Sequence, residues 1–176
     1  MKTKLLFASV LALGLVASQT AHAALNAYLT LKGNKQGEIK GSVTQKGREG
    51  KIMVIAVDHQ IKPGQSKLQH GAFVITKELD KSTPLLFKAA TTGETFDFEL
   101  QFWTPQIQAQ QGVGAERQHY TVKLTGAKIV EYDFKMPNNK NPELIKFAEY
   151  EEISFTYDKI EWTWVDGGIT ASDTNP

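Results

Sequence analysis

The sequence predicts a mainly β protein, an antiparallel β-barrel or two-sheet sandwich with one short α-helix. Segments in which apolar and polar residues alternate recur along the chain, which is the pattern of half-buried strands. A clear helix signal occurs once, near residues 82–93. Some eight strands with turn residues between them indicate a barrel or a pair of packed sheets. The 176 residues are 41% hydrophobic and 22% charged, which is typical of one globular domain.

The first 23 residues have the three parts of a secretory signal peptide. Lys2 and Lys4 form a basic start, residues 5–16 form an apolar core, and Ala21-His22-Ala23 is an A-x-A cleavage site. The apolar run is shorter than the roughly 20 residues that a membrane span needs. We therefore expect cleavage after Ala23, no stable membrane insertion of the cleaved chain, and one domain over residues 24–176. Its last residues, 167–176, are predicted to be a polar tail.

Composition excludes several classes of function. The chain has no cysteine, which rules out a disulfide framework, a thiolate zinc site, an iron–sulfur cluster and a cysteine nucleophile. Without Lys2 and Lys4, 18 Lys and Arg stand against 19 Asp and Glu, a formal charge of −1. This balance argues against nucleic acid as a partner, because phosphate binding depends on accumulated positive charge.

In the first half of the mature chain we expect four strands. Residues 27–32 alternate and end at Gly33-Asn34, and residues 38–44 form a weaker, polar strand. Residues 51–57 are apolar at both odd and even positions, that is, on both faces of a strand. Residues 61–70 have the composition of a loop. The fourth strand covers residues 73–79.

A short helix is expected next. Ser82 or Thr83 can serve as the N-cap, and Pro84 fits the first helical position because it has no N–H to leave unpaired. The helix should end near Gly93 and pack on the sheet.

The second half is predicted to be all strand and turn. Residues 96–103 place Phe96, Phe98, Leu100 and Phe102 on one face, and residues 105–114 form a loop or hairpin tip. Gly126 separates two alternating runs, 120–124 and 130–136, which we interpret as an antiparallel pair.

The closing strand is predicted to change face. A turn at 137–142 and a loop or single helical turn up to residue 150 precede it. The apolar parity then shifts between Ile153-Phe155-Tyr157 and Ile160-Trp162-Trp164, which predicts a bulge near Asp158-Lys159. Such a bulge allows one run of chain to serve two sheets.

Two patterns point to assembly. An apolar strand on both parities needs cover on both faces, either from a second layer of its own domain or from another subunit. The chain is also basic over residues 32–51 (net +4) and acidic over residues 143–166 (net −5), which suits head-to-tail association or mutual neutralisation within one fold. The candidate subunit-interface residues are Ile52, Val54, Ile55, Val57, Lys46, Arg48, Lys51, Glu151, Glu152, Trp162 and Trp164.

We find no positive signal for catalysis, a metal or a cofactor, and we expect no enzyme. The histidines of the mature chain show no metal-ligand spacing, and no phosphate loop, dinucleotide fingerprint or nucleophile elbow occurs. Asp58-His59 are neighbours in a strand and point to opposite faces, which does not make a catalytic pair. Glu149, Glu151 and Glu152 read as a solvated approach to a strand.

Several blocks resemble the haemolysin-coregulated protein (Hcp) family, the tube subunit of bacterial type VI secretion. They are residues 37–42 (GEIKGS), 46–55 (KGREGKIMVI), 75–88 (ITKELDKSTPLLFK), 118–124 (QHYTVKL) and 153–164 (ISFTYDKIEWTW). The resemblance covers nearly all of the mature chain in order. It implies a β-barrel with an appended helix and a hexameric ring that stacks into a hollow tube. It also implies spike, sheath and effector proteins as partners, and no active site.

The signal peptide departs from the family pattern, because family tubes are built in the cytosol and leave through their own machine. Either the chain is exported and forms rings in the periplasm or outside the cell, or the tube assembles in the cytosol from a chain that starts near Ala24. A third possibility is an exported binding module that uses Trp103, Trp162 or Trp164 on a carbohydrate or protein surface.

Overall fold

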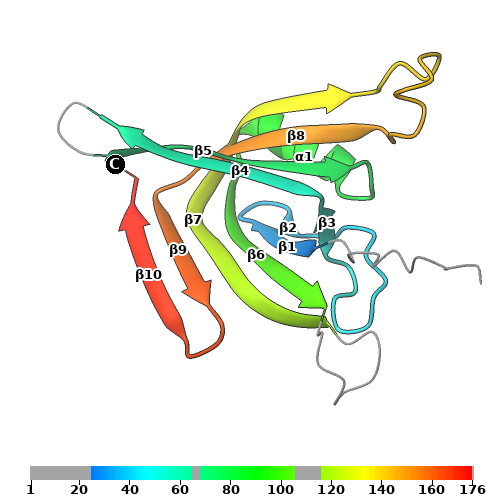
Figure 1. The fold of residues 1–176 in the computed structure, drawn as a ribbon. Helices are drawn as coiled ribbons and strands as arrows, with labels where there is room; N and C mark the ends of the chain where they lie inside the picture. The colour runs from blue at the N-terminus through cyan, green and yellow to red at the C-terminus, as the bar shows by residue number, and fades with distance from the viewer. Residues whose placement is uncertain (1–24, 65–67, 106–115, 176) are drawn as a thin grey trace, which may run out of the picture.

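A computed structural model of the protein describes residues 25–64, 68–105 and 116–175. This part of the chain folds into one antiparallel sheet and one helix, so the predicted fold class is confirmed (Figure 1). The elements are β1 (Asn26–Gly33), β2 (Gly37–Ile39), β3 (Ile52–Val54), β4 (Ala56–Pro63), β5 (Leu68–Glu78), α1 (Thr83–Thr92), β6 (Thr95–Pro105), β7 (Glu116–Lys135), β8 (Tyr150–Thr156), β9 (Lys159–Trp164) and β10 (Ile169–Thr174).

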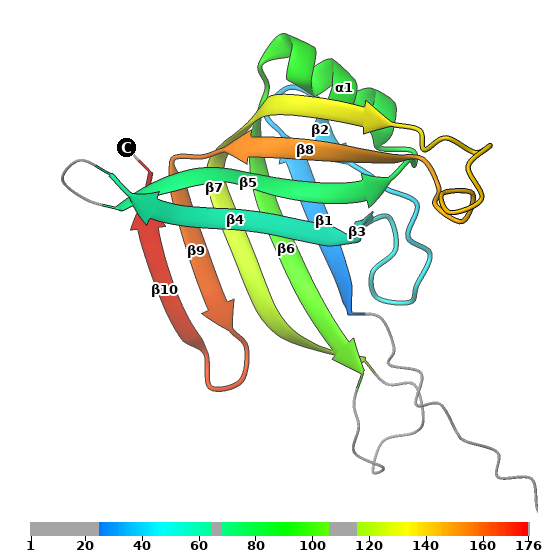
Figure 2. The ribbon, with the colours of Figure 1, turned by 45° about the horizontal axis from the view of Figure 1, so that its top comes forward.

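The sheet curls around its own core. Its main path is β2-β1-β6-β7-β8-β5-β4, and β3 pairs with β1, β9 with β7 and β10 with β9. Both views show the strands wrapping into a barrel-like body, and Figure 2 shows α1 lying beside β7 on its outer side. Aromatic and aliphatic side chains from the strands fill the inside, and Phe155 contacts both Phe96 and Phe98 edge-on.

One long strand, β7, replaces the antiparallel pair that the sequence predicted. Its first half pairs with β9 and its second half with β8, while β6 runs along it across the bend. Gly126, with a φ of 66°, sits at the bend, where a side chain would also collide with the carboxylate of Asp158. The prediction of a break at Gly126 was wrong, because this glycine bends a continuous strand rather than ending it.

The expected helix is confirmed as α1. Ser82 is the N-cap residue, Pro84 lies in the first turn and Gly93 ends the helix with a left-handed φ of 61°. The Ser82 hydroxyl donates to Asp80 Oδ1 at 2.5 Å rather than to a helix N–H. Leu86 and Ala89 are buried against the sheet.

Three other expectations change. The weak second strand ends at Ile39, and the strand expected over 51–57 divides at Ile55 into β3, which pairs with β1, and β4, which pairs with β5. Of residues 61–70, expected to be a loop, 61–63 extend β4 and 68–70 begin β5. The loop expected over 105–114 lies almost wholly outside the described residues.

The C-terminal segment differs most from expectation. Residues 169–174, predicted to be part of a polar tail, form β10, which pairs with β9. The four-residue loop 165–168 joins the two strands, and its Gly167 and Gly168 have φ values of 80° and 65°, a conformation that favours glycine. The predicted change of face is present as a break between β8 and β9. No helix in the described part of the chain is long and apolar enough to span a membrane.

Candidate assembly surface

The strand that is apolar on both parities divides its residues between core and surface. Ile52 and Val54 are 0% and 2% exposed and belong to the core of the subunit itself. Ile55 is 55% exposed, and Val57 is half-buried against the core cluster. The interface hypothesis for this strand therefore narrows to Ile55 and Val57.

The basic segment divides in the same way. Arg48 is buried, lies 4.2 Å above the ring of Trp103 and 4.8 Å above that of Tyr28, and pairs with Glu116 at 2.5 Å. Lys51 is half-buried and donates to Gln101 Oε1 at 2.7 Å, whereas Lys46 is exposed. Arg48 therefore fastens the segment between β2 and β3 to the sheet and leaves Lys46 at the surface.

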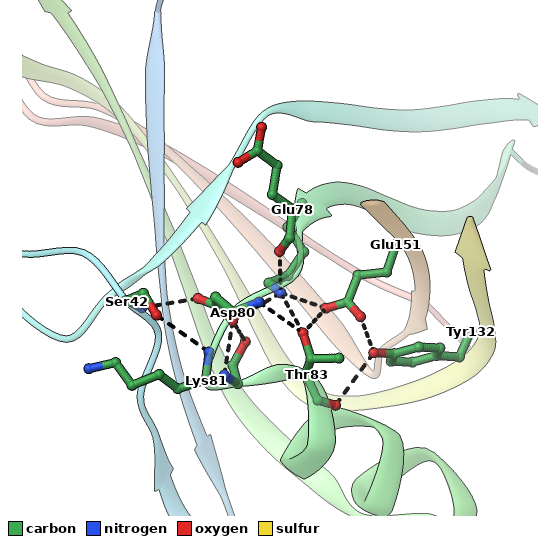
Figure 3. A network of polar contacts seen from close by, with 9 residues as sticks. Ser42, Glu78, Asp80, Lys81, Thr83, Tyr132 and Glu151 are labelled. Carbon is green, nitrogen blue, oxygen red and sulfur yellow. Dashed lines mark hydrogen bonds and ion pairs between the residues drawn. The ribbon is translucent and has the colours of Figure 1, made fainter. Parts of the chain in front are cut away.

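In the acidic segment, Glu151 lies at the centre of a buried polar network (Figure 3). Both Glu151 and Lys77 are fully buried, and Lys77 Nζ donates to Glu151 Oε1 at 2.5 Å. Thr83 at the start of α1 donates to the same oxygen at 3.1 Å, and Tyr132 of β7 donates to the other. Four elements, β5, α1, β7 and β8, therefore meet at one carboxylate.

The ionisation of the network is fixed by its surroundings. Burial, then the hydrogen bond to Glu151, raises the pKa of Tyr132, so its hydroxyl stays protonated. Burial alone would raise the pKa of Asp80, but hydrogen bonds from Ser82 and Lys77 and the Lys77 charge lower it. The network thus holds α1 on the sheet and serves the fold of the subunit.

No ion pair among the described residues joins the basic segment directly to the acidic segment. Charged residues of each segment pair elsewhere, as when Arg48 pairs with Glu116 and Glu152 pairs with Lys135.

The tryptophans lie mostly against the protein itself. Trp162 is half-buried and stacks on His70 with ring centroids 6.2 Å apart, and Trp103 packs against Arg48 and Tyr28. Trp164 is 45% exposed beside His119. Of the three, Trp164 offers the largest surface to a partner.

Sequence reasoning missed an exposed apolar surface. A groove of about 550 Å³, called here the loop groove, opens beside the segment between β7 and β8. Met136 and Phe147 are 59% and 55% exposed in it, and the interface candidate Ile55 forms part of its wall. Its lining residues are Ile55, Thr76, Lys135, Met136, Pro137, Leu144, Phe147 and Tyr150.

A second apolar hollow lies where α1 crosses β7. Phe87 and Phe134, 58% and 54% exposed, line it together with Pro84 and Tyr132, and Phe87 meets the Tyr132 ring edge-on. The alternation Val130-Tyr132-Phe134 was visible in the sequence, but it marks a face covered only in part by a short helix. Exposed apolar surfaces of this kind are typical of protein–protein contacts.

The acidic side chains that the sequence grouped together are used separately in the fold. Among the described residues, no group of three or more His, Asp or Glu side chains is arranged to hold a metal ion. Of the three carboxylates considered together in the sequence, Glu151 is sequestered by Lys77 and Glu152 is paired with Lys135, while Glu149 is exposed.

A curled antiparallel sheet with an appended helix and large exposed apolar residues is typical of a protein that contacts other proteins. A family model described as type VI secretion system effector, Hcp, matches residues 28–164. The "Major exported protein" of Pseudomonas aeruginosa is 33% identical over 165 residues, which cover 84% of this chain and 93% of that protein. The chain belongs to the Hcp family of type VI secretion tube proteins.

Solved structures agree with this assignment. The secreted protein Hcp3 from Pseudomonas aeruginosa has a TM-score of 0.71 at 31% identity, with 87% of this chain and 99% of that chain covered. A mutant form of Hcp1 from E. coli EAEC 042 has a TM-score of 0.69 at 35% identity, covering 85% and 97%. Another structure, described as an Hcp protein, has a TM-score of 0.76 at 27% identity, covering 87% and 99%.

Proposed function

We propose that this chain is a structural tube subunit that forms hexameric rings, that these rings stack head to tail, and that it catalyses no reaction. Membership of the Hcp family supports the tube, since ring oligomers are characteristic of that family. The observation that carries the contact surface is the loop groove, where Ile55, Met136 and Phe147 are each more than half exposed. Burying such residues against a neighbouring copy stabilises a ring by removing apolar area from water.

The proposal assigns different roles to the residues that the sequence singled out. Ile55 contacts the neighbouring subunit through the loop groove. The outward charges of the basic and acidic segments, such as Lys46 and Glu152, orient successive rings. The buried candidates, Arg48 and Glu151, shape the subunit that presents these surfaces.

A charge placed in the loop groove tests the contact. Ile55→Asp should convert rings into folded monomers, because an unpaired carboxylate cannot be buried at an apolar interface. Ile61→Asp is the matched control, since Ile61 is 44% exposed on β4, the strand that follows Ile55, but does not line the groove. Light scattering gives the mass of each variant, and circular dichroism shows whether it is folded. Rings that survive Ile55→Asp would remove the loop groove from the contact.

We also propose that residues 1–23 act as a cleaved signal peptide and that the chain is exported. In that case rings form in the periplasm or outside the cell, and effectors can occupy the lumen there. The chain does not meet the spike and sheath proteins in the cytosol before its export. Mass spectrometry tests this: a precursor that still carries Met1 inside the cell, together with an exported chain that starts at Ala24, supports it. An intact Met1 on the exported protein would instead indicate cytosolic assembly with the spike and sheath.

A further inference from the structure

Two histidines share one tyrosine hydroxyl where the β4–β5 hairpin meets the C-terminal strand. His59 Nε2 lies 2.6 Å from the Tyr157 hydroxyl oxygen, and His70 Nδ1 lies 2.9 Å from the same oxygen. His70 Nε2 lies 3.1 Å from Asp173 Oδ2. His59 belongs to β4, His70 to β5 and Asp173 to β10, while Tyr157 follows β8, so this four-residue chain, called here the histidine chain, links separate parts of the sheet.

The inner members of the histidine chain, Tyr157 and His70, are shielded from water, whereas the Asp173 side chain is 61% exposed. Tyr157 is 2% exposed and the His70 side chain 3%, while His59 is half-buried against Phe73 and Trp162 stacks on His70. The charged residues of β5 and β8 lie at the far ends of those strands. The charged groups closer to the chain are Asp58 and Lys62 of β4, Asp158 beside Tyr157, Lys159 and Glu161 of β9, which pair with each other, and Asp173 of β10.

With both imidazoles neutral, one direction of hydrogen bonding satisfies every member. A carboxylate only accepts, so His70 donates from Nε2 to Asp173 and its Nδ1 must accept. Burial, then the charge of Asp173, raises the pKa of Tyr157 to about 12, so Tyr157 keeps its proton and donates it to His70. The Tyr157 oxygen is then free to accept from His59 Nε2.

One added proton can be accommodated by reversal. If His70 becomes an imidazolium, it donates from both nitrogens, to Asp173 and to the Tyr157 oxygen. Tyr157 then donates to His59 Nε2, and His59 carries its own hydrogen on Nδ1. Every group stays paired, and the imidazolium lies beside the Asp173 carboxylate.

A second proton cannot be accommodated. With both rings charged, both nitrogens that face Tyr157 donate, and the Tyr157 hydroxyl proton has no acceptor within the chain. Two cations with ring centroids 5.7 Å apart would also repel each other in a poorly hydrated site. We propose that the histidine chain is an acid-sensitive clasp, which binds one proton by reversing its hydrogen bonds and opens the contact between β10 and the β4–β5 hairpin when the second proton binds.

The element that the clasp holds is suited to release. All six residues of β10 are exposed, and its strand partner is β9. The end of β10 is also tied by Asn175, whose N–H donates to the Asp158 carbonyl at 2.8 Å. Opening the clasp would expose a sheet edge in addition to the edge at β4. This would change the surface that a tube subunit presents to its partners.

The direction of the pH effect follows from His59. Burial lowers the pKa of His59, the nearby His70 lowers it further, and Asp58 acts in the opposite sense. The opened state therefore binds more protons than the closed state below about pH 6.5, so the closed state loses stability as pH falls through that value. Uptake of one proton on opening makes the opening constant rise by up to about tenfold per pH unit.

Hydrogen exchange of the full-length protein between pH 6.5 and 5.0 tests the clasp. The protection factors of the Ile169–Thr174 amides should fall by up to about tenfold per pH unit, while those of β1 stay constant. His59→Gln keeps a donor for Tyr157 but cannot be charged, so its β10 protection should not change over this range. His119→Gln, a matched half-buried histidine outside the chain, should behave as the wild type.

NMR titration of the two imidazoles in the unmodified protein provides a second measurement that needs no variant. We expect the His59 imidazole to titrate below the ordinary histidine value, with the loss of β10 protection accompanying that step. An unchanged fall in β10 protection in His59→Gln would overturn the proposal. So would a His59 titration at the ordinary histidine value with β10 fully protected throughout.

Discussion

Replacing Lys77 with methionine should destabilise the subunit by about 3–5 kcal/mol, because it leaves the Glu151 carboxylate buried without its cation. Both side chains are 0% exposed, so water cannot replace the lost contact. Thr83 and Tyr132 still donate to Glu151, but neutral donors compensate only part of a buried charge. For a domain of this size the loss corresponds to a fall in Tm of about 6–20 °C.

Urea unfolding, monitored by tryptophan fluorescence, measures this loss of stability. Arg117→Met is the control, since the Arg117–Asp166 pair is about half exposed and should contribute at most about 1 kcal/mol. The penalty of Lys77→Met should shrink at low pH, where the orphaned carboxyl can take up a proton, and adding Glu151→Gln should recover part of it. A Lys77→Met variant no less stable than Arg117→Met would refute the assignment of Lys77 and Glu151 as the pair that holds α1 to the sheet.

Three further predictions concern the bend, acid stability and stacking. Gly126→Ala should destabilise the subunit by about 1–3 kcal/mol in thermal unfolding, because φ is positive there and a Cβ would meet Asp158. Burial alone would raise the pKa of Glu116, but the hydrogen bonds from Arg48, Asn26 and Gln45 lower it. The stabilisation that ionised Glu116 provides is therefore present above about pH 4.5 and is lost as pH falls through the lowered pKa. Glu116→Gln should accordingly flatten the acid-unfolding curve. Stacking of rings, observed by electron microscopy, should weaken from low to high salt, and stacking independent of salt would eliminate the charge argument.

Periodicity identified the strands well where one face is buried. Residues 96–103 alternate strictly, and of the side chains predicted to share one face, Phe96, Phe98 and Leu100 are at most 2% exposed and Phe102 is half-buried against the core. The helix was also predictable, because Pro84 and Gly93 act through local geometry that does not depend on the rest of the fold. These signals are short-range, and a single sequence contains them in full.

Long-range partners could not be derived in this way. Gly126 looks the same in sequence whether it ends a strand or bends one, and only pairing with β6, β8 and β9 decides the outcome. Residues 169–174 lack an apolar face, so nothing local distinguishes a solvated edge strand from a tail.

The candidate interface shows the same limit. Charge and apolarity selected Arg48, Ile52 and Glu151, which the fold uses internally. Exposed residues of the loop groove, such as Met136 and Phe147, carry no sequence signal that separates them from core residues. Burial depends on which strands meet, and a list of residue types does not specify that.

The mass in solution of the purified chain from Ala24 to Pro176, measured by light scattering with electron microscope images of the same sample, tests the central claim most directly. We predict a ring of six subunits. A stable folded monomer would contradict the tube and would indicate that this Hcp fold serves as an exported binding module.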